Sequence, residues 1–192
     1  MKSLKLINIM YKDYVLTGSP FFRFLSSNTT IAPLWLIVRL YVGWEWLVAG
    51  WGKVTNPAWF GTDAGPAITG FVGGALKKTA EFCPPEKACH PDVQGWYAAF
   101  LENFVLPFPE FWSNLVAGGE VLVGVALMLG VVTGIAAFFG AFMNLNFMLA
   151  GTVSVNPILF TLGIGLMFAW KVAGHIGLDR WVLPSLERYF KK

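Results

Sequence analysis

Residues 31–53 read IAPLWLIVRLYVGWEWLVAGWGK, an apolar run that contains three charged residues, Arg39, Glu45 and Lys53. A helix rises about 1.5 Å per residue, so residues 31–51 are long enough to cross the roughly 30 Å of hydrocarbon in a bilayer. Three more apolar stretches of comparable length follow, at residues 111–131, 134–155 and 157–174. We therefore predict an all-α fold, an integral membrane four-helix bundle.

The composition agrees with a protein that has the lipid bilayer as its surroundings. Of the 192 residues, 56% are hydrophobic and only 13% are charged, about half the charged share of a soluble domain. The nine Trp and 17 Phe are residue types that collect where hydrocarbon meets water. The net charge of +3 comes without a basic run, so we do not expect a nucleic acid as a partner.

The charges outside the apolar stretches predict the topology. Lys and Arg outnumber Asp and Glu in residues 1–30 and again after the fourth stretch, which is typical of cytoplasmic segments. We expect a cytoplasmic interfacial segment over residues 1–30, whose residues 4–14 form a helix on the inner surface, one transmembrane domain over 31–177 and a cytoplasmic tail over 178–192. Both termini of this multi-pass cell (plasma) membrane protein would then be cytoplasmic.

The long connection at residues 52–110 is expected outside the cell. It contains four Lys but six acidic residues, and it is too long to be a bare link between two helices. We predict that it contains short helices lying on the outer surface. These helices either form a lid over a site or merely cover the outer end of the bundle.

Cys83 and Cys89 lie in this outer connection with C-x5-C spacing. We expect a disulfide in an oxidising compartment, with a redox-active pair as the alternative. His90 adds a third metal ligand but no fourth is present nearby, so we expect no metal site. His90 and His175 are not placed to hold haem within the helices, two Cys are too few for an iron–sulfur cluster, and no nucleotide-binding motif occurs. Electrons would have to come from a diffusible carrier.

Polar residues within the apolar stretches are the strongest indication of a site, because each is costly to place in lipid and should face the bundle or water. Counting about 1.5 Å per residue places five of them in one polar layer: Arg39, Glu45, Glu120, Asn144 and Asn146. Within this layer we expect Arg39 to pair with Glu120. The layer either fixes helix packing or binds a ligand.

Around the first helix, Arg39, Gly43, Gly50 and Lys53 fall within about 80° of one another. This face allows a neighbouring helix to approach closely at the glycines. Lys53 either interacts with the carboxyl end of its own helix or attracts anions at the outer surface.

Several short motifs occur in a characteristic order along the chain. The first helix contains R-x3-G (39–43) and G-x2-K (50–53), the second contains E-x3-G-x2-L-x2-G (120–130), and the last is followed by G-x2-G-L-D (174–179). In this order the motifs resemble those of the DoxX family of small four-helix membrane proteins, and the outer stretch GWYAAF (95–100) is similar to that of its longer members. The resemblance covers residues 30 to 185.

The resemblance implies kinship with DoxD, the membrane subunit of thiosulfate:quinone oxidoreductase (thiosulfate dehydrogenase, quinone). This would be a redox subunit that passes electrons from thiosulfate or another sulfur compound to membrane quinone. In DoxD-type enzymes a DoxA subunit is fused or partnered, so a DoxA-like or other redox subunit is an expected partner, as is another copy of this chain in a homo-oligomer.

A quinone-linked redox function would give particular residues specific roles. The catalytic group would comprise Arg39 with Glu45 or Glu120 as proton donor and acceptor. The slot for the quinone would combine apolar and polar side chains, namely Arg39, Trp44, Trp46, Phe142, Asn144 and Asn146. Lys53 and Arg39 would bind the sulfur oxyanion. Two alternatives remain: a non-catalytic membrane partner that docks a peripheral redox enzyme, and a transporter of small solutes or protons.

Overall fold

The computed structural model describes residues 19–82 and 91–190, and the regular secondary structure in these residues is helical, which confirms the predicted all-α class. The α-helices are α2 (Pro20–Ser27), α3 (Ala32–Val54), α4 (Pro66–Leu76), α5 (Gly95–Phe100), α6 (Pro109–Leu129), α7 (Thr133–Leu149), α8 (Asn156–Phe168), α9 (Trp170–Ala173) and α10 (Asp179–Phe190). Three short segments have other helical forms, with 3-10 turns at Thr29–Ile31 and Ala80–Phe82 and a π-helix at Leu101–Val105.

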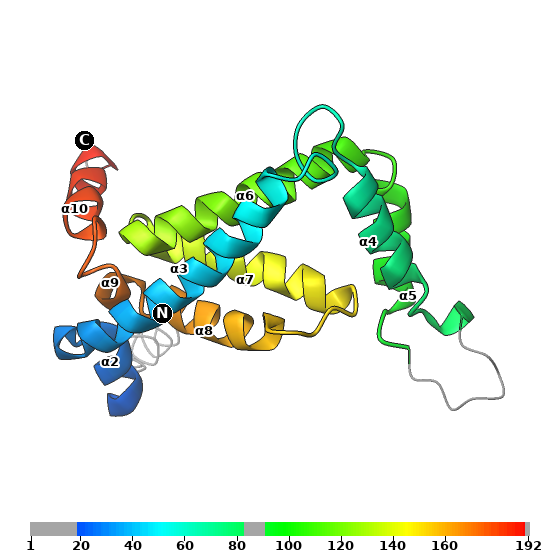
Figure 1. Ribbon diagram of the computed structural model, residues 1–192. Helices are drawn as coiled ribbons and strands as arrows, with labels where there is room; N and C mark the ends of the chain where they lie inside the picture. Colours follow the sequence, from blue (N-terminus) through cyan, green and yellow to red (C-terminus); the bar gives the residue numbers. More distant parts are fainter. Residues whose placement is uncertain (1–18, 83–90, 191–192) are drawn as a thin grey trace, which may run out of the picture.

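Helices α3, α6, α7 and α8 lie side by side as a bundle (Figure 1). Helix α3 packs most extensively against α6, and α7 against α8. Their shared core contains Val42, Trp46, Leu127, Leu159 and Leu166. Helices α2, α9 and α10 gather at one end of the bundle, whereas α4 and α5 lie at the other (Figure 1).

Two helical segments are long and apolar enough to cross a membrane within the described residues, Thr29–Val54 and Pro109–Leu129. The third and fourth predicted spans, 134–155 and 157–174, are shorter helices than expected. Helix α7 ends at Leu149, and the next residues include Gly151 and Ser154 with positive φ angles of 71° and 39°, which a continuous helix does not accommodate. Helix α8 is interrupted at Ala169 before α9 begins.

The helix boundaries follow local sequence chemistry. Pro occupies the first turn of α3, α4, α6 and α8, where its missing N–H costs no helical hydrogen bond. Helix α6 stops at Gly130, whose φ of 65° is left-handed, a conformation that glycine adopts without strain. The Asn156-Pro157 pair starts α8, at the boundary between the third and fourth apolar stretches of the sequence.

The connection between α3 and α6 contains the predicted short helices. Helices α4 and α5 share a second apolar core that includes Ile68, Val72, Tyr97 and Leu101. The Tyr97 hydroxyl donates to the Asn146 backbone carbonyl over 3.0 Å and lies 3.1 Å from Asn146 Oδ1. This contact attaches α5 to the end of α7. Cys83, Cys89 and His90, and the interfacial helix expected at residues 4–14, lie outside the described residues.

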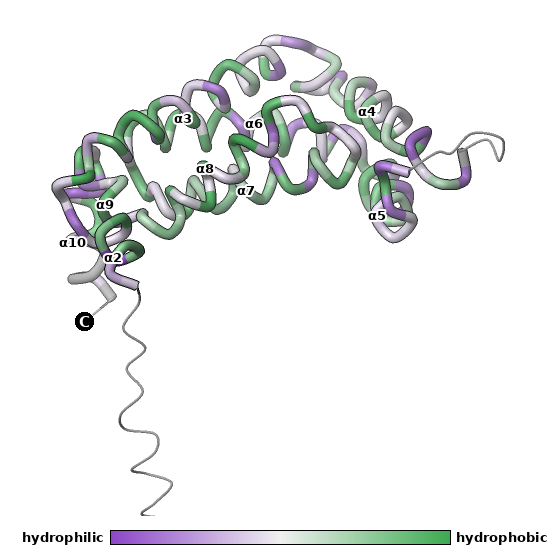
Figure 2. The backbone as a smooth tube through the Cα atoms, turned by 90° about the horizontal axis from the view of Figure 1, so that it is seen from below, coloured by the Kyte–Doolittle hydropathy of each residue, from purple (hydrophilic) through white to green (hydrophobic). Residues whose placement is uncertain are grey.

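Hydrophobic residues prevail along α3, α6, α7 and α8 (Figure 2). Many of them point outward rather than into the core. The exposed fraction of the side chain is 65% for Ile37, 72% for Leu122, 50% for Phe138 and 55% for Ile158, so that each of the four helices contributes to the apolar exterior. An exterior of this kind is unusual for a soluble monomer.

Candidate functional site

Glycines bring the backbones of α3 and α6 into direct contact. A methyl group at Gly50 would lie 2.6 Å from the Val121 backbone nitrogen, and one at Gly124 would lie 2.6 Å from the Leu47 backbone nitrogen. A methyl group at Gly43 would lie 3.0 Å from the backbone nitrogen of Met128. These contacts confirm the predicted glycine face of the first helix. They also fix the register of the two antiparallel helices.

In this register Glu120 pairs with Lys53. The Lys53 Nζ atom lies 2.6 Å from Glu120 Oε2, with Glu120 buried at 1% exposure and Lys53 exposed at 21%. Lys53 Nζ also lies 5.3 Å from the centre of the Trp59 ring, within the range of a cation–π interaction. Lys53 therefore connects a fully buried carboxylate to the protein surface.

The prediction that Arg39 pairs with Glu120 is wrong. Arg39 donates from Nη1 to the Leu127 carbonyl over 2.9 Å and from Nη2 to the Ile176 carbonyl over 2.7 Å. Arg39 precedes Lys53 by 14 positions, about 21 Å along a helix, so it lies opposite the far end of α6. The predicted single layer that includes both Arg39 and Glu120 is therefore divided between the two ends of the bundle.

At the end of the bundle where Arg39 lies, hydrogen bonds attach the closing segment, residues 174–179, to the amino end of α7. The buried Asp179 carboxylate accepts hydrogen bonds from the backbone N–H groups of Val132 and Thr133 over 2.6 and 2.9 Å. These donors lie at the amino end of α7, where a negative charge is favourable. Asp179 has no role among the predicted site residues, although it lies within the G-x2-G-L-D motif. Its position and that of Arg39 indicate structural roles.

A second group of polar atoms lies inside the bundle, within about one helical turn of the level of the buried carboxylate. A methyl group at Gly140 would lie 3.0 Å from Trp46 Nε1 and 3.2 Å from a methyl carbon of Val123. Asn144 is one turn beyond Gly140, and Glu120 is one turn from Val123 in the same direction, because α6 and α7 are antiparallel. Asn144 therefore lies at about the level of Glu120 along the bundle, and Trp46 lies about one helical turn away from that level.

Hydrogen-bonding capacity in this group is unused within the described part of the chain. Trp46 Nε1 and both the Oδ1 and Nδ2 atoms of Asn144 are buried and have no hydrogen-bond partner there. Buried polar atoms are almost always paired in proteins, and each exception calls for an explanation. We define the polar cluster as Trp46, Lys53, Glu120 and Asn144. Its side chains offer an indole N–H, an amide, an ammonium group and a carboxylate.

The remaining predicted residues lie outside this cluster. Asn146 donates to the Phe142 carbonyl over 2.8 Å and contacts Tyr97, so it belongs to the junction with α5. Trp44 and Phe142 are 56% and 53% exposed on the outside of the bundle. Glu45 is partly buried. The structure thus separates Asn144, which is buried between the helices, from Asn146, which lies at the junction with α5.

The position of Tyr97 affects its acidity. Burial in the second apolar core raises the pKa of Tyr97 to about 12, from an ordinary value of 10.0. The hydroxyl therefore stays protonated at neutral pH and acts as a hydrogen-bond donor toward Asn146. This role is structural, because the hydroxyl fastens α5 to α7.

No cluster of three or more His, Cys, Asp or Glu residues suited to a metal ion occurs among residues 19–82 and 91–190. The DoxX family matches residues 34–156 of the chain, a range that contains the whole polar cluster. Comparison with curated proteins gives no match, and neither does comparison with solved structures.

Proposed function

The chain belongs to the DoxX family, and from this premise we propose that it is a four-span membrane protein with a quinone-linked redox function. Helices α3 and α6 are the two longest candidate spans. Helix α7 and the combined segment of α8 and α9 would extend about 26 and 27 Å, close to the thickness of the hydrocarbon layer. The apolar exteriors of all four helices support this topology, in which α2 and α10 lie at the cytoplasmic end.

The unused hydrogen-bonding capacity of Asn144 and Trp46 is the observation that carries the proposed function. A quinone has two carbonyl oxygens that accept hydrogen bonds and a flat apolar ring. The amide of Asn144 and the N–H of Trp46 are donors of the required type, in surroundings that are otherwise apolar. Both belong to the core of the bundle, where a membrane quinone would arrive from the lipid between helices.

The adjacent ion pair suits the proton transfer that quinone reduction requires. A quinone takes up two electrons and two protons to become a quinol. Glu120 is buried, whereas its partner Lys53 reaches the surface, so the pair would relay protons from water to the buried site. With thiosulfate as donor, two thiosulfate anions would each lose one electron and join through a new S–S bond, which balances the reaction.

The roles proposed for individual residues change accordingly. Of the two residues expected to bind the sulfur oxyanion, Lys53 is partly exposed and Arg39 is buried at the other end of the bundle. We assign Asn144 and Trp46 to quinone binding, Glu120 to proton transfer, and Lys53 to both the proton path and the approach of the anion. Arg39 takes no part in the reaction.

The test compares two asparagines on the same helix. We would measure binding of a short-chain quinone to the purified protein, and its thiosulfate-dependent reduction, for the wild type, Asn144→Leu and Asn146→Leu. We expect Asn144→Leu to weaken quinone binding at least tenfold, which corresponds to the loss of one hydrogen bond in an apolar site, and Asn146→Leu to retain it.

Each result of this comparison has a clear meaning. Equal quinone binding by the wild type and Asn144→Leu would contradict the assigned site. If the wild type binds quinone but thiosulfate does not reduce it, thiosulfate is the wrong donor, whereas the quinone site is supported. Glu120→Gln should bind quinone and reduce it more slowly, because the amide cannot transfer a proton.

A further inference from the structure

The segment between α3 and α4, residues 55–65, folds back over the start of α6 (Figure 1). It turns at Gly61 and Gly65, whose φ angles of 105° and 126° suit glycine and strain other residues. The Asn114 side chain of α6 binds both polar groups of the Gly61 backbone, since it accepts from the N–H over 2.9 Å and donates to the carbonyl over 3.1 Å. Contacts with α6 therefore determine the conformation of this segment.

Trp59 lies in the middle of this segment, and several contacts hold it there. The buried Ser113 hydroxyl donates to the Trp59 carbonyl over 2.7 Å, and the Trp59 N–H donates to the Asn56 carbonyl over 2.9 Å. The ring of Trp59 is partly buried and packs against the second apolar core, to which α4 and α5 contribute. Because Lys53 Nζ lies 5.3 Å from the centre of this ring, the same contacts set the surroundings of the ammonium group.

Lys53 has other conformations available to it. It lies in the last turn of α3, which ends at Val54, and its side chain is 21% exposed. A lysine side chain loses much conformational entropy when it is held in one rotamer, and this loss opposes its pairing with Glu120. A ring beside the ammonium group attracts it without adding a charge. Trp59 therefore favours the rotamer in which Lys53 Nζ meets Glu120 Oε2.

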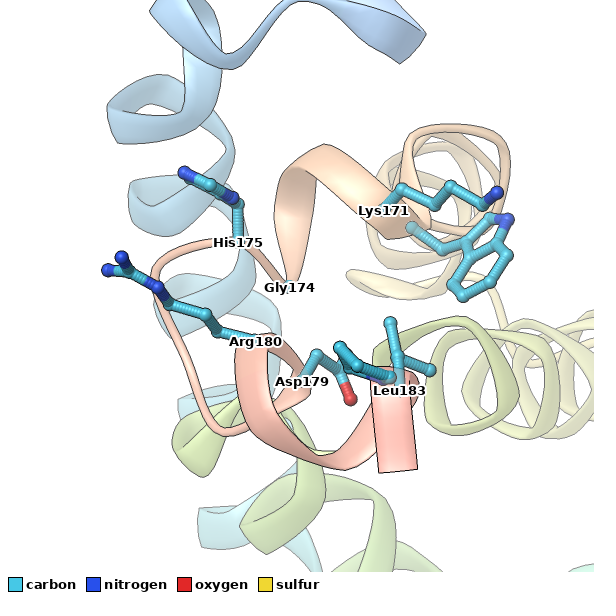
Figure 3. Close-up of a pocket in the computed structure, with 8 residues that line it drawn as sticks. Lys171, Gly174, His175, Asp179, Arg180 and Leu183 are labelled. Carbon is cyan, nitrogen blue, oxygen red and sulfur yellow. The ribbon is translucent and has the colours of Figure 1, made fainter. Parts of the chain in front are cut away.

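Lys171 provides a comparison within the same chain. Its Nζ atom lies 5.2 Å from the centre of the Trp170 ring, yet Lys171 is exposed and forms no salt bridge in the described part of the chain. In the pocket at that end of the bundle, Lys171 and Arg180 extend away from each other on opposite sides of Gly174 (Figure 3). Lys53 differs because an aromatic ring and a buried carboxylate meet at the same ammonium group.

We propose that Trp59 is a positioning residue that holds the Lys53 ammonium group against Glu120 and partly covers it. This inference rests on the proposed function, in which the pair carries protons to the buried site. A proton passes from Lys53 Nζ to the Glu120 carboxylate across the 2.6 Å between them, and the amine that remains takes up a proton from water. Trp59 transfers no proton itself. It keeps the donor and the acceptor within hydrogen-bond distance.

The first test measures how fast acetic anhydride labels Lys53 in the detergent-purified full chain, by mass spectrometry of its peptides. Trp59→Leu should raise this rate about fivefold, the factor that corresponds to one cation–π interaction, whereas Trp59→Phe keeps an aromatic ring and should raise it at most about twofold. Trp170→Leu makes the same change beside Lys171 and is the matched control, with labelling of Lys53 unchanged. The exposed Lys77 is the internal reference.

The second test follows quinone reduction by the same variants. Trp59→Leu should lower kcat about fivefold and leave the KM for quinone unchanged, because the ring acts on the proton path and not on the quinone site. Trp59→Phe should retain most of the wild-type kcat. Circular dichroism of each variant would verify that the helices are intact.

Three results would overturn the proposal. An unchanged labelling rate of Lys53 in Trp59→Leu would show that the ring does not hold the ammonium group. An equal increase in Trp170→Leu would show that the bundle has loosened as a whole. A wild-type kcat in Trp59→Leu would show that proton transfer does not need the ring. If labelling changes as expected but the wild type reduces no quinone, the position of Trp59 is supported and the proposed function is wrong.

Discussion

Lys53 and Glu120 are 67 positions apart in sequence, yet their side chains meet at 2.6 Å across the α3–α6 interface. The carboxylate is almost completely buried, and its partner is the one cation that reaches it among the described residues. Removal of one member of such a pair leaves the other charge buried without compensation, which is more costly than removal of both.

We therefore expect Lys53→Met to lower the free energy of unfolding by about 3 kcal/mol, and Lys53→Met/Glu120→Gln to lower it by less. Thermal denaturation in detergent, followed by circular dichroism, would measure both. A double variant less stable than Lys53→Met would contradict the interaction of the two side chains.

Asn144 should show opposite effects on stability and function. Asn144→Leu removes a buried amide whose atoms have no partner in the described chain, so we expect the free energy of unfolding to rise by about 1 kcal/mol while quinone binding weakens. Thermal denaturation of the ligand-free variant shows whether the substitution raises or lowers the stability of the protein. A lower Tm than that of the wild type would indicate that the amide serves packing instead.

Gly50 and Gly52 form a matched pair on one helix. A methyl group at Gly50 meets the Val121 backbone, whereas nothing lies within 4 Å of one at Gly52. Gly50→Ala should force α3 and α6 apart and cost about 1–3 kcal/mol. Gly52→Ala should be neutral or stabilise by about 0.5–1 kcal/mol, because alanine is the better helix former. Equal melting temperatures for the two variants would contradict the close contact.

Asp179 should hold the closing segment in place. Asp179→Asn replaces one carboxylate oxygen with an N–H₂ group, so one of the two backbone N–H groups of Val132 and Thr133 loses its acceptor. We expect a loss of about 1–3 kcal/mol and faster hydrogen exchange at residues 174–179. Asp63→Asn, at an exposed position, is the control and should leave this exchange unchanged. Unaltered hydrogen exchange at residues 174–179 in Asp179→Asn would show that these hydrogen bonds do not hold the segment in place.

The raised pKa of Tyr97 predicts that the stability of the folded protein decreases at alkaline pH. Burial raises its pKa from 10.0 to about 12 in the folded protein, so the protonated hydroxyl is favoured by folding. Its contribution to stability is fully present below pH 10 and is lost as the pH rises to about 12. Ultraviolet titration of tyrosinate in the wild type minus Tyr97→Phe should isolate this late-titrating group. A difference curve centred near pH 10 would be inconsistent with the burial of Tyr97.

Local features of the fold were predictable because they depend on neighbouring residues. The Asn156-Pro157 pair marks the start of α8, and the Gly43 and Gly50 face predicts close helix contact through the 100° rotation per residue. The lengths of α7 and α8 were overestimated. Their apolar character continues past Leu149 and Phe168, but a break in the backbone at Gly151 and at Ala169 does not depend on hydropathy.

The sequence by itself determined the helical class, the apolar stretches, the family motifs and the presence of charged groups that must avoid lipid. The tertiary structure decided which of these groups meet. A shift of one residue between helices moves a side chain by about 1.5 Å and 100°, so depth counting alone paired Glu120 with Arg39. The glycine contacts between α3 and α6 set the actual register, which places Lys53 at Glu120 and leaves Arg39 to bind the carbonyls of Leu127 and Ile176.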